Sequence, residues 1–413
     1  MLAATRSEAT ARAQAAAAPL EYLDRIREAF PATRRQSPAP VAYDSVRATI
    51  DDLQPSEPVF CINPAELRAA AKRFSSFPGR ALYAVKCNPD PFVLKTLFDA
   101  GITDFDVASI DEVRLIDSLF GKAAGQFFNN PAKTRPAIRS ASTEFGIRFY
   151  TADSVAEIDK ILEEAVSEKD LIIAVRLLTV AKDARYILST KFGADVEEAV
   201  QMLNHISKSG AKTGISFHVG SQCLAPQAFS SALSLVDKVA RKARVPLSVL
   251  NVGGGFPAPY PGDEVRGLEY YFSHIVRGRR DLQLPSGCLV VCEPGRSLVA
   301  TAGTVILQVV NRRDRSIFVN DGVFGTLQEL GHPKERRPLT LHRRGSSPSS
   351  RTAEFKVYGP TCDSNDVLGA PFVLAEDVRE GDWIEVGMMG AYSLSMRTRF
   401  NGFYTEKIVA IGA

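Results

Sequence analysis

The feature that most constrains the fold is the alternation of short apolar runs with helix-like segments between residues 81 and 292. The helical spacing of apolar side chains is clearest in 194–209 and 228–242. The apolar runs, each expected to be a buried strand, are 81–85, 104–108, 126–129, 147–151, 171–177, 214–218, 248–252 and 289–292. Strands that alternate with helices form parallel sheets, and eight such units predict a closed (β/α)8 barrel.

The pattern changes at about residue 297. Apolar runs separated by turns, without long helices, follow at 304–310, 316–319, 354–358, 383–386 and 407–411. They predict a C-terminal β-sandwich or β-barrel domain over 297–413, after a barrel domain over 58–296. The polar, Ser-rich segment 342–351 is expected to be a mobile loop.

The first 57 residues read as an extension and linker. Residues 1–18 are rich in Ala, Arg, Ser and Thr, which is typical of a transit peptide, but nearby acidic residues favour a frayed helix. An amphipathic helix over 21–30 and a linker over 34–40 are expected to follow. We expect no chemistry here.

Charge and cysteine content exclude several classes of protein. The net charge is +3, from 50 Lys and Arg against 47 Asp and Glu, with no basic stripe, so no nucleic-acid partner is expected. The six cysteines lack zinc-site spacing, which predicts no metal and a reducing compartment. No apolar run approaches the roughly 20 residues of a membrane span. A soluble, cytoplasmic enzyme without a membrane partner is expected.

Two charged residues at strand ends indicate the chemistry. Lys86 follows the first barrel run and Glu293 follows the last, so both are expected at the carboxyl end of the barrel, where such folds keep their active sites. A lysine whose pKa is lowered by desolvation can form a Schiff base. A carboxylate can hold a cofactor ring nitrogen protonated. The pair indicates pyridoxal phosphate, although a lone lysine at a barrel end is more often in an ion pair.

A glycine run follows the seventh barrel strand. Gly253, Gly254 and Gly255 would let backbone N–H groups approach a phosphate closely. A tight turn uses glycine too, but the position after a barrel strand favours a phosphate cradle.

These motifs, in order and spacing from about Pro58 to the C-terminus, resemble the fold-type III pyridoxal-phosphate decarboxylases, the ornithine and lysine decarboxylase group with an alanine-racemase-like barrel. The motifs are 84–88 (AVKCN), 217–222 (FHVGSQ), 251–257 (NVGGGFP), 292–296 (CEPGR) and 358–366 (YGPTCDSND). The resemblance implies pyridoxal 5'-phosphate as cofactor. It also implies that 58–62 pairs with strands of the β domain.

The resemblance assigns roles around the cofactor. Lys86 would bind it covalently, His218 would lie over its ring, and Glu293 would face the ring nitrogen, where related racemases tend to place arginine. The phosphate contacts would be Ser221, Gly253, Gly254, Gly255, Gly295, Arg296 and Tyr392. Asp106 and Arg176 would lie beside the cofactor, although a structural ion pair would leave the same pattern.

The second half of the site is implied to come from another subunit. In the resembled family the loop 358–366 enters the partner's active site, where Cys362 would protonate the substrate carbon and Asp363 would receive a distal amino group. Lys191 and Asp366 match an ion pair between subunits. A homodimer follows, and Phe400 is also expected at the substrate. A turn with a buried cysteine would explain the Gly-Pro pair but not the adjacent thiol and acid.

One departure leaves the substrate open. Ornithine enzymes of the group carry an aspartate in an aromatic-Asp-His context after the Asp-Gly-Val-aromatic-Gly segment, and 321–332 lacks it. Either Glu329 replaces it or Asp363 acts alone. We expect decarboxylation of ornithine or lysine to putrescine or cadaverine. Another diamino acid or a carboxylated polyamine is the alternative.

Other functions fit less well. The diaminopimelate branch has a glutamate-glycine motif near its C-terminal cysteine that is not seen here. A racemase would need a catalytic tyrosine opposite Lys86, and Tyr392 matches a phosphate contact better. A non-catalytic regulator would be expected to lose cofactor residues such as Lys86, Glu293 and Cys362, which are present.

Overall fold

The computed structural model describes residues 39–412 except 167–169, 180–183, 187–190 and 283. The extension 1–38, including the expected helix at 21–30, lies outside the described residues. No helix among the described residues is long and apolar enough to cross a membrane.

Eight parallel strands close into a barrel, as predicted from the apolar runs. Each strand lies within two residues of its predicted position at both ends. The strands are β3 (Arg80–Ala84), β4 (Asp104–Val107), β5 (Gly125–Phe128), β6 (Phe149–Ala152), β7 (Ile172–Arg176), β9 (Lys212–Ser216), β11 (Leu247–Asn251) and β12 (Leu289–Cys292). The barrel interior is filled by a separate apolar cluster that includes Leu82, Phe127 and Val291. Alternate residues such as Tyr83 and Phe128 point outward to the main core.

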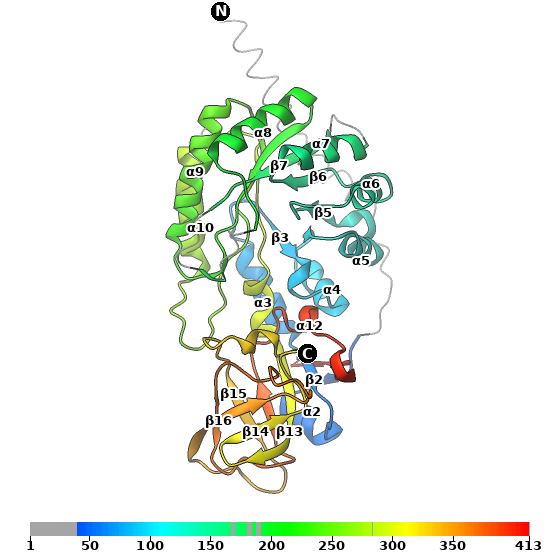
Figure 1. The fold of residues 1–413 in the computed structure, drawn as a ribbon, viewed down its shortest axis with the longest axis vertical. Coiled ribbons are helices and arrows are strands. Elements are labelled where there is room, and N and C mark those ends of the chain that lie inside the picture. Colours follow the sequence, from blue (N-terminus) through cyan, green and yellow to red (C-terminus); the bar gives the residue numbers. More distant parts are fainter. Residues whose placement is uncertain (1–38, 167–169, 180–183, 187–190, 283, 413) are drawn as a thin grey trace, which may run out of the picture.

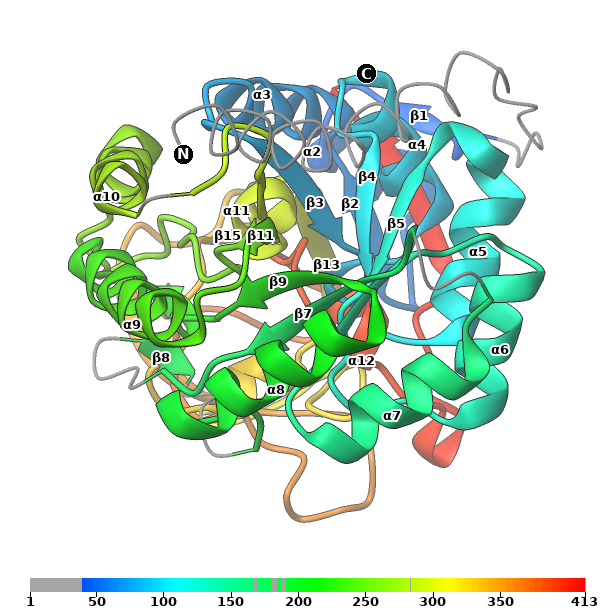
Figure 2. The same cartoon turned by 90° about the horizontal axis from the view of Figure 1, so that it is seen from above.

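Helices surround the barrel, as Figure 2 shows from above. They are α3 (Pro64–Phe74), α4 (Pro91–Asp99), α5 (Ile110–Phe120), α6 (Arg135–Thr143), α7 (Val155–Glu164), α8 (Val196–Ser209), α9 (Gln227–Ala243) and α10 (Leu268–Asp281). Local sequence sets their ends: α8 begins with a capping box between Asp195 and Glu198 and stops at left-handed Gly210. The expected helices 194–209 and 228–242 correspond to α8 and α9.

A nine-stranded sheet lies beneath the barrel in Figure 1. Its strands are β1 (Ala42–Tyr43), β2 (Val59–Ile62), β13 (Gly303–Arg313), β14 (Ser316–Val319), β15 (Leu339–His342), β16 (Thr352–Tyr358), β17 (Phe372–Ala375), β18 (Trp383–Val386) and β19 (Lys407–Ile411). The early strand β2 pairs antiparallel with β13 and parallel with β19. A division of the chain into domains at residues 57 and 296 stays a prediction.

Short elements complete the chain. They are α2 (Val46–Leu53), the antiparallel strand pair β8 (Ala184–Tyr186) and β10 (Ser221–Cys223), α11 (Arg296–Val299), α12 (Ser393–Met396), and the 3-10 turns η1 (Val85–Cys87), η2 (Gly121–Ala123), η4 (Ala300–Ala302), η5 (Gln328–Gly331) and η6 (Phe400–Gly402). The polar segment 342–351 is anchored at its start, because His342 ends β15 and buried Arg343 forms ion pairs with Asp382 and Asp377.

Candidate active site at the carboxyl end of the barrel

Lys86 lies in η1, directly after β3, and its amine faces the neighbouring strand β4. The Nζ atom is 3.3 Å from Oδ2 of Asp106, whose side chain is 2% exposed against 48% for Lys86. Asp106 raises the pKa of Lys86, and this effect outweighs desolvation, which lowers it. The expectation of a pKa lowered overall is therefore wrong, because the carboxylate of Asp106 stabilises the ammonium form more than desolvation disfavours it.

Glu293 follows β12 and is buried. Its Oε1 atom accepts hydrogen bonds from Nδ2 of Asn129 at 2.9 Å and from Nδ2 of Asn251 at 2.6 Å. Burial and then the charge of Asp106 raise the pKa of Glu293 to about 7, while Lys86 and Arg176 oppose the rise. The proton on this carboxyl group is therefore finely balanced near neutral pH.

The glycine run packs too closely against its neighbours for side chains. A Cβ atom on Gly253 would lie 2.0 Å from the carbonyl oxygen of Phe217. One on Gly254 would lie 2.6 Å from the carbonyl oxygen of Glu293 and 3.0 Å from Nε2 of His218. The backbone of this loop thus stands directly beside the predicted ring-binding residues, as a cradle requires.

His218 presents a neutral imidazole ring. Its Nδ1 atom accepts a hydrogen bond from the N–H of Gly220 at 2.9 Å, which places the ring proton on Nε2. Burial, followed by the charges of Arg176 and Lys86, lowers the pKa of His218 well below its usual value. A flat, uncharged ring of this kind can lie against an aromatic cofactor.

Arg296, at the start of α11, is clamped by polar and aromatic groups. Its Nε donates to Oγ of Ser221 at 3.4 Å, and Nη1 donates to the hydroxyl of Tyr260 at 2.9 Å. The guanidinium carbon lies 4.9 Å from the ring centre of Tyr392. Three predicted phosphate contacts, Ser221, Arg296 and Tyr392, are thus brought together.

Tyr392 and its neighbours connect the C-terminal part of the chain to the turn that holds Lys86. The N–H of Tyr392 donates to the carbonyl of Cys87 at 2.8 Å. The side chain of Asn88 donates to the carbonyl of Gly390 at 2.9 Å. Gly295 packs on the same turn, since a Cβ there would lie 3.0 Å from the Cβ of Cys87.

Glu329, the candidate substitute for the family aspartate, is fully engaged by arginines. Oε1 is 2.5 Å from Nη2 of Arg296, and Oε2 is 2.8 Å from Nη1 of Arg296 and 3.2 Å from Nη2 of Arg337. Arg337 also forms an ion pair with Glu335, and Glu335 forms a second ion pair with Arg185. The carboxylate of Glu329 is therefore not free in the way that a substrate-binding group would be.

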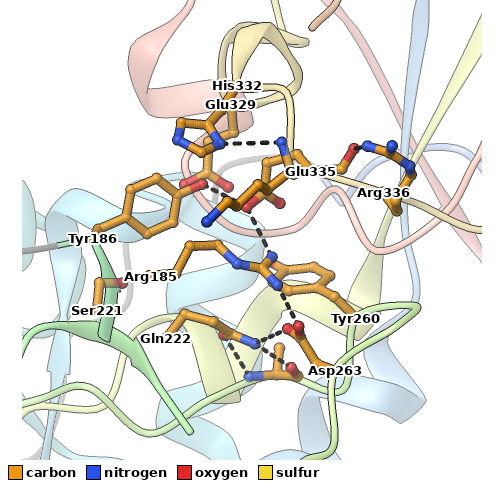
Figure 3. A network of polar contacts seen from close by, with 12 residues as sticks. Arg185, Tyr186, Ser221, Gln222, Tyr260, Asp263, Glu329, His332, Glu335 and Arg336 are labelled. Carbon is orange, nitrogen blue, oxygen red and sulfur yellow. Dashed lines mark hydrogen bonds and ion pairs between the residues drawn. The ribbon is translucent and has the colours of Figure 1, made fainter. Parts of the chain in front are cut away.

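Figure 3 shows part of this polar network, in which residues from distant segments meet. Tyr186 donates to Glu335 at 2.9 Å, Arg185 pairs with Asp263, and Gln222 donates to Asp263 at 2.9 Å. The network joins the β8–β10 strand pair to the segment after η5. Sequence reasoning missed it, because no motif connects segments so far apart.

The loop with Cys362 lies at the surface. The N–H and Sγ of Cys362 donate to Oδ1 of Asn401 at 3.3 and 3.4 Å. Phe400, 40% exposed, packs on Phe324 with ring centres 4.8 Å apart. Within the described part of the chain, no hydrogen bond joins the segment 359–366 to Lys86 or Glu293. The hydrogen bonds of Cys362 therefore tie it to Asn401 rather than to the barrel site.

Asp366 and Lys191, the residues predicted to pair between subunits, each have contacts within their own chain. Asp366 is buried and accepts from the N–H groups of Val323 and Thr361, so its carboxylate closes its own loop. The amine of Lys191 lies 4.9 Å from the ring centre of Phe192. Their pairing between subunits stays a prediction. No group of three or more potential metal ligands occurs among the described residues.

Asn129 and Asn251, which contact Glu293, were also missed by sequence reasoning. Asn129 directly follows β5 and Asn251 ends β11, so each occupies a strand end like the predicted residues. Their position was the available signal. Asparagine is also common in turns, however, so its presence at a strand end does not by itself predict a functional role.

Comparisons with known proteins agree with this geometry. Residues 64–300 match the family model for the pyridoxal-binding domain of pyridoxal-dependent decarboxylases. The lysine/ornithine decarboxylase of Selenomonas ruminantium is 32% identical over 332 residues, covering 78% of this chain and 81% of that protein.

Solved structures resemble the whole fold. The arginine decarboxylase of Paramecium bursaria Chlorella virus bound to agmatine has a TM-score of 0.77 at 26% identity, covering 88% of this chain and 98% of that one. The lysine/ornithine decarboxylase of Vibrio vulnificus complexed with putrescine has a TM-score of 0.76 at 27% identity, covering 89% and 99%. With Lys86, Glu293 and the glycine cradle assembled at the carboxyl end of the barrel, the chain belongs to the pyridoxal-dependent decarboxylase family.

Proposed function

We propose that the chain decarboxylates a basic L-amino acid, ornithine or lysine, to the corresponding diamine. The observation that carries the proposal is the placement of Lys86 and buried Glu293 at adjacent strand ends, since β3 and β12 are neighbours in the barrel. The relatives that act on lysine, ornithine and arginine support a basic substrate.

The residues present fit pyridoxal phosphate. The glycine cradle leaves no space for side chains, His218 offers a neutral ring, and Arg296 and Ser221 offer donors for a phosphate. When bound at Lys86, the cofactor supplies an electron sink for the bond to the leaving carboxylate. Glu293 would hold a proton at the ring nitrogen, and the cradle would orient the ring by its phosphate.

We propose that the active protein is a homodimer in which Cys362 and Asp363 serve the partner's site. The surface position of this loop, next to exposed Phe400 and Phe403, supports an interface there. Cys362 would deliver a proton to the substrate carbon after carbon dioxide leaves. This arrangement would also explain why the described hydrogen bonds of the loop do not reach Lys86 in its own chain.

We assign the distal amino group of the substrate to Asp363 alone. Glu329 is held by Arg296 and Arg337, so removing it from them would leave two arginines without their shared anion. Glu329 then acts on the phosphate side, as a carboxylate that orients Arg296. Cys61, Cys87, Cys288, Cys292 and Cys362 form no disulfide, which supports a reducing, cytoplasmic location.

The test is carbon dioxide release by the purified protein, loaded with pyridoxal phosphate, from L- and D-ornithine, lysine, arginine and diaminopimelate. Release from L-ornithine or L-lysine, with formation of the diamine, is expected. Interconversion of enantiomers without carbon dioxide would identify a racemase instead. Absence of both reactions, with bound cofactor, would support a non-catalytic regulator and contradict the proposal.

A further inference from the structure

The carboxylate of Glu293 receives two amide donors on the same oxygen. Asn129 and Asn251 both donate to Oε1, at 2.9 and 2.6 Å, from strand ends on different sides of the barrel. Within the part of the chain that the structure describes, no hydrogen bond reaches Oε2. One oxygen is thus tied to the protein and the other is left for a ligand.

The orientation of each amide is set by a second contact. Oδ1 of Asn251 accepts from the N–H of Gly253 at 2.9 Å, and Oδ1 of Asn129 accepts from the hydroxyl of Thr151 at 3.0 Å. Because the oxygen end of each amide is engaged, its NH2 group must face Glu293. The two asparagines can therefore only donate to this carboxylate.

These contacts connect Glu293 to the phosphate cradle and to a neighbouring strand. Asn251 bridges the carboxylate to Gly253, whose carbonyl also accepts from the N–H of Glu293 at 2.8 Å. Asn129 bridges it to Thr151 in β6, whose carbonyl accepts from Nζ of Lys133 at 2.7 Å. The carboxylate is fixed relative to β5, β6, β11 and the cradle at once.

The charged surroundings of Glu293 are closely balanced. Asp106 from β4 opposes ionisation, while Lys86 from η1 and Arg176 at the end of β7 favour it. His218, near the cradle at Gly254, is neutral. Burial acts with Asp106 and brings the pKa of Glu293 to about 7. Amide donors stabilise the ionised carboxylate more than the protonated acid, so they lower the pKa of Glu293.

We propose that Asn129 and Asn251 are positioning residues that keep Glu293 ionised and hold its second oxygen ready for the cofactor ring nitrogen. The inference rests on the proposed function, in which Glu293 holds the proton of that nitrogen. Neither asparagine touches the reacting atoms. They act through Glu293, which in turn would keep the ring nitrogen of the cofactor protonated.

Four variants test the inference in the full-length protein, with and without pyridoxal phosphate. Asn129→Ala and Asn251→Ala each remove one donor. Asn251→Asp keeps the shape and the acceptor for Gly253 but replaces the donor with a carboxylate. Asn130→Ala is the matched control, because Asn130 is the adjacent asparagine and donates to the carbonyl of Ala108 at 3.2 Å, away from Glu293.

The readouts are the protonation midpoint of Glu293, followed by infrared difference spectra against Glu293→Gln, and the pH profile of kcat. The midpoint of Glu293 protonation and the midpoint of the kcat profile should each rise by about one pH unit in each alanine variant. A hydrogen bond to a charged group is worth about a tenfold change in proton affinity or more. Asn251→Asp should raise them further, and Asn130→Ala should leave them unchanged.

Folded Asn251→Asp and Asn129→Ala proteins with wild-type midpoints would overturn the inference. Thermal unfolding checks folding, and the isosteric aspartate variant keeps the test open if an alanine variant does not fold. Failure of the proposed function looks different. The wild-type protein would then release no carbon dioxide, whatever the midpoint of Glu293.

Discussion

At the residue scale, the site depends on buried or half-buried charges whose neighbours set their protonation. Asp106, 3.3 Å away, holds Lys86 as an ammonium. The pKa of Glu293 is raised to about 7, so this carboxyl group is partly protonated at neutral pH. Asp106 raises the pKa of both groups, and charged groups with shifted pKa values in one cluster are typical of catalytic sites. The positive charge of Lys86 would therefore attract the anionic cofactor before the covalent bond forms.

Lys86→Ala should abolish covalent cofactor binding and lower kcat by at least about a thousandfold, because among the described residues only Lys86 places an amine beside Asp106. Borohydride reduction should leave no pyridoxyl adduct on the variant, and carbon dioxide release gives the rate. Exposed Lys72→Ala on α3 serves as control and should behave like wild type. A reducible adduct at a normal rate in Lys86→Ala would refute the assignment.

Glu329→Gln and Asp363→Asn should separate two roles. Without the bidentate contact to Glu329, Arg296 must be ordered when the phosphate binds, so the dissociation constant of pyridoxal phosphate should rise about tenfold with little change in KM.

Asp363→Asn should instead raise KM about tenfold at unchanged cofactor affinity, since it removes a charged partner of the substrate amine. Cofactor titration and steady-state kinetics measure both. A raised KM in Glu329→Gln alone would return the amine-binding role to Glu329.

Sequence could predict the residues whose type and position are both unusual. A lysine and a glutamate at the ends of apolar strands, and three successive glycines, stand out without a structure. Asn129 and Asn251 do not stand out, because their importance depends on which side chain they face, and the sequence marks Glu329 only as a possible substrate ligand. The pairing of Glu329 with Arg296 becomes visible only when α11 and η5 are placed together.

At the element scale, one buried ion pair holds the ends of neighbouring barrel strands. Nζ of Lys133, after β5, is 3.0 Å from Oε1 of Glu157 in α7 and donates to the carbonyl of Thr151 in β6. Burial lowers the pKa of Lys133 to about 8, from 10.5. The folded state therefore binds the proton less tightly than the unfolded state.

Glu157→Gln should destabilise the protein by about 3 kcal/mol at pH 7, because it leaves a buried ammonium without its partner. The pKa of Lys133 should fall further. The unfolded state would then bind more protons than the folded state over a wider range below pH 10.5, so stability should rise more steeply with pH than in wild type. Urea unfolding at pH 7 and pH 9 measures this. Glu163→Gln, in an exposed pair with Arg135, should change little, and an equal loss in both variants would contradict the assignment.

Element positions were predictable because buried strands need apolar residues and helices need periodic ones. The segment 342–351 shows where this reasoning fails. Its composition predicts a mobile loop, yet Arg343 is buried with Asp382 and Asp377. The long side chain of Arg343 anchors the segment through two partners that are distant in sequence. The overall composition of a segment does not reveal such a single contact.

At the scale of the whole molecule, the proposed homodimer makes each active site depend on two chains. Lys86→Ala and Cys362→Ala subunits should each be inactive alone but restore activity when mixed. After random exchange half of the dimers are mixed and each has one intact site of two, so recovery should approach about a quarter of wild type. Carbon dioxide release after verified subunit exchange is the measurement.

The control mixture pairs Lys86→Ala with Glu293→Gln. Both changes lie in the barrel half of the site, so no mixed dimer contains an intact site, and activity should stay at the level of the parents. No recovery in the first mixture would show that Cys362 does not serve the partner's site, and recovery in the control would show that complementation does not depend on the loop.

The position of β2 between β13 and β19 has a consequence for synthesis on the ribosome. All four residues of β2 are buried, and its hydrogen-bonding partners emerge hundreds of residues later. A nascent chain can close its barrel while this apolar strand still has both edges open. The strand is then exposed to chaperones and to other nascent chains until β19 is released. Translation speed near the end of the message, rather than barrel formation, should govern the yield of correctly assembled protein.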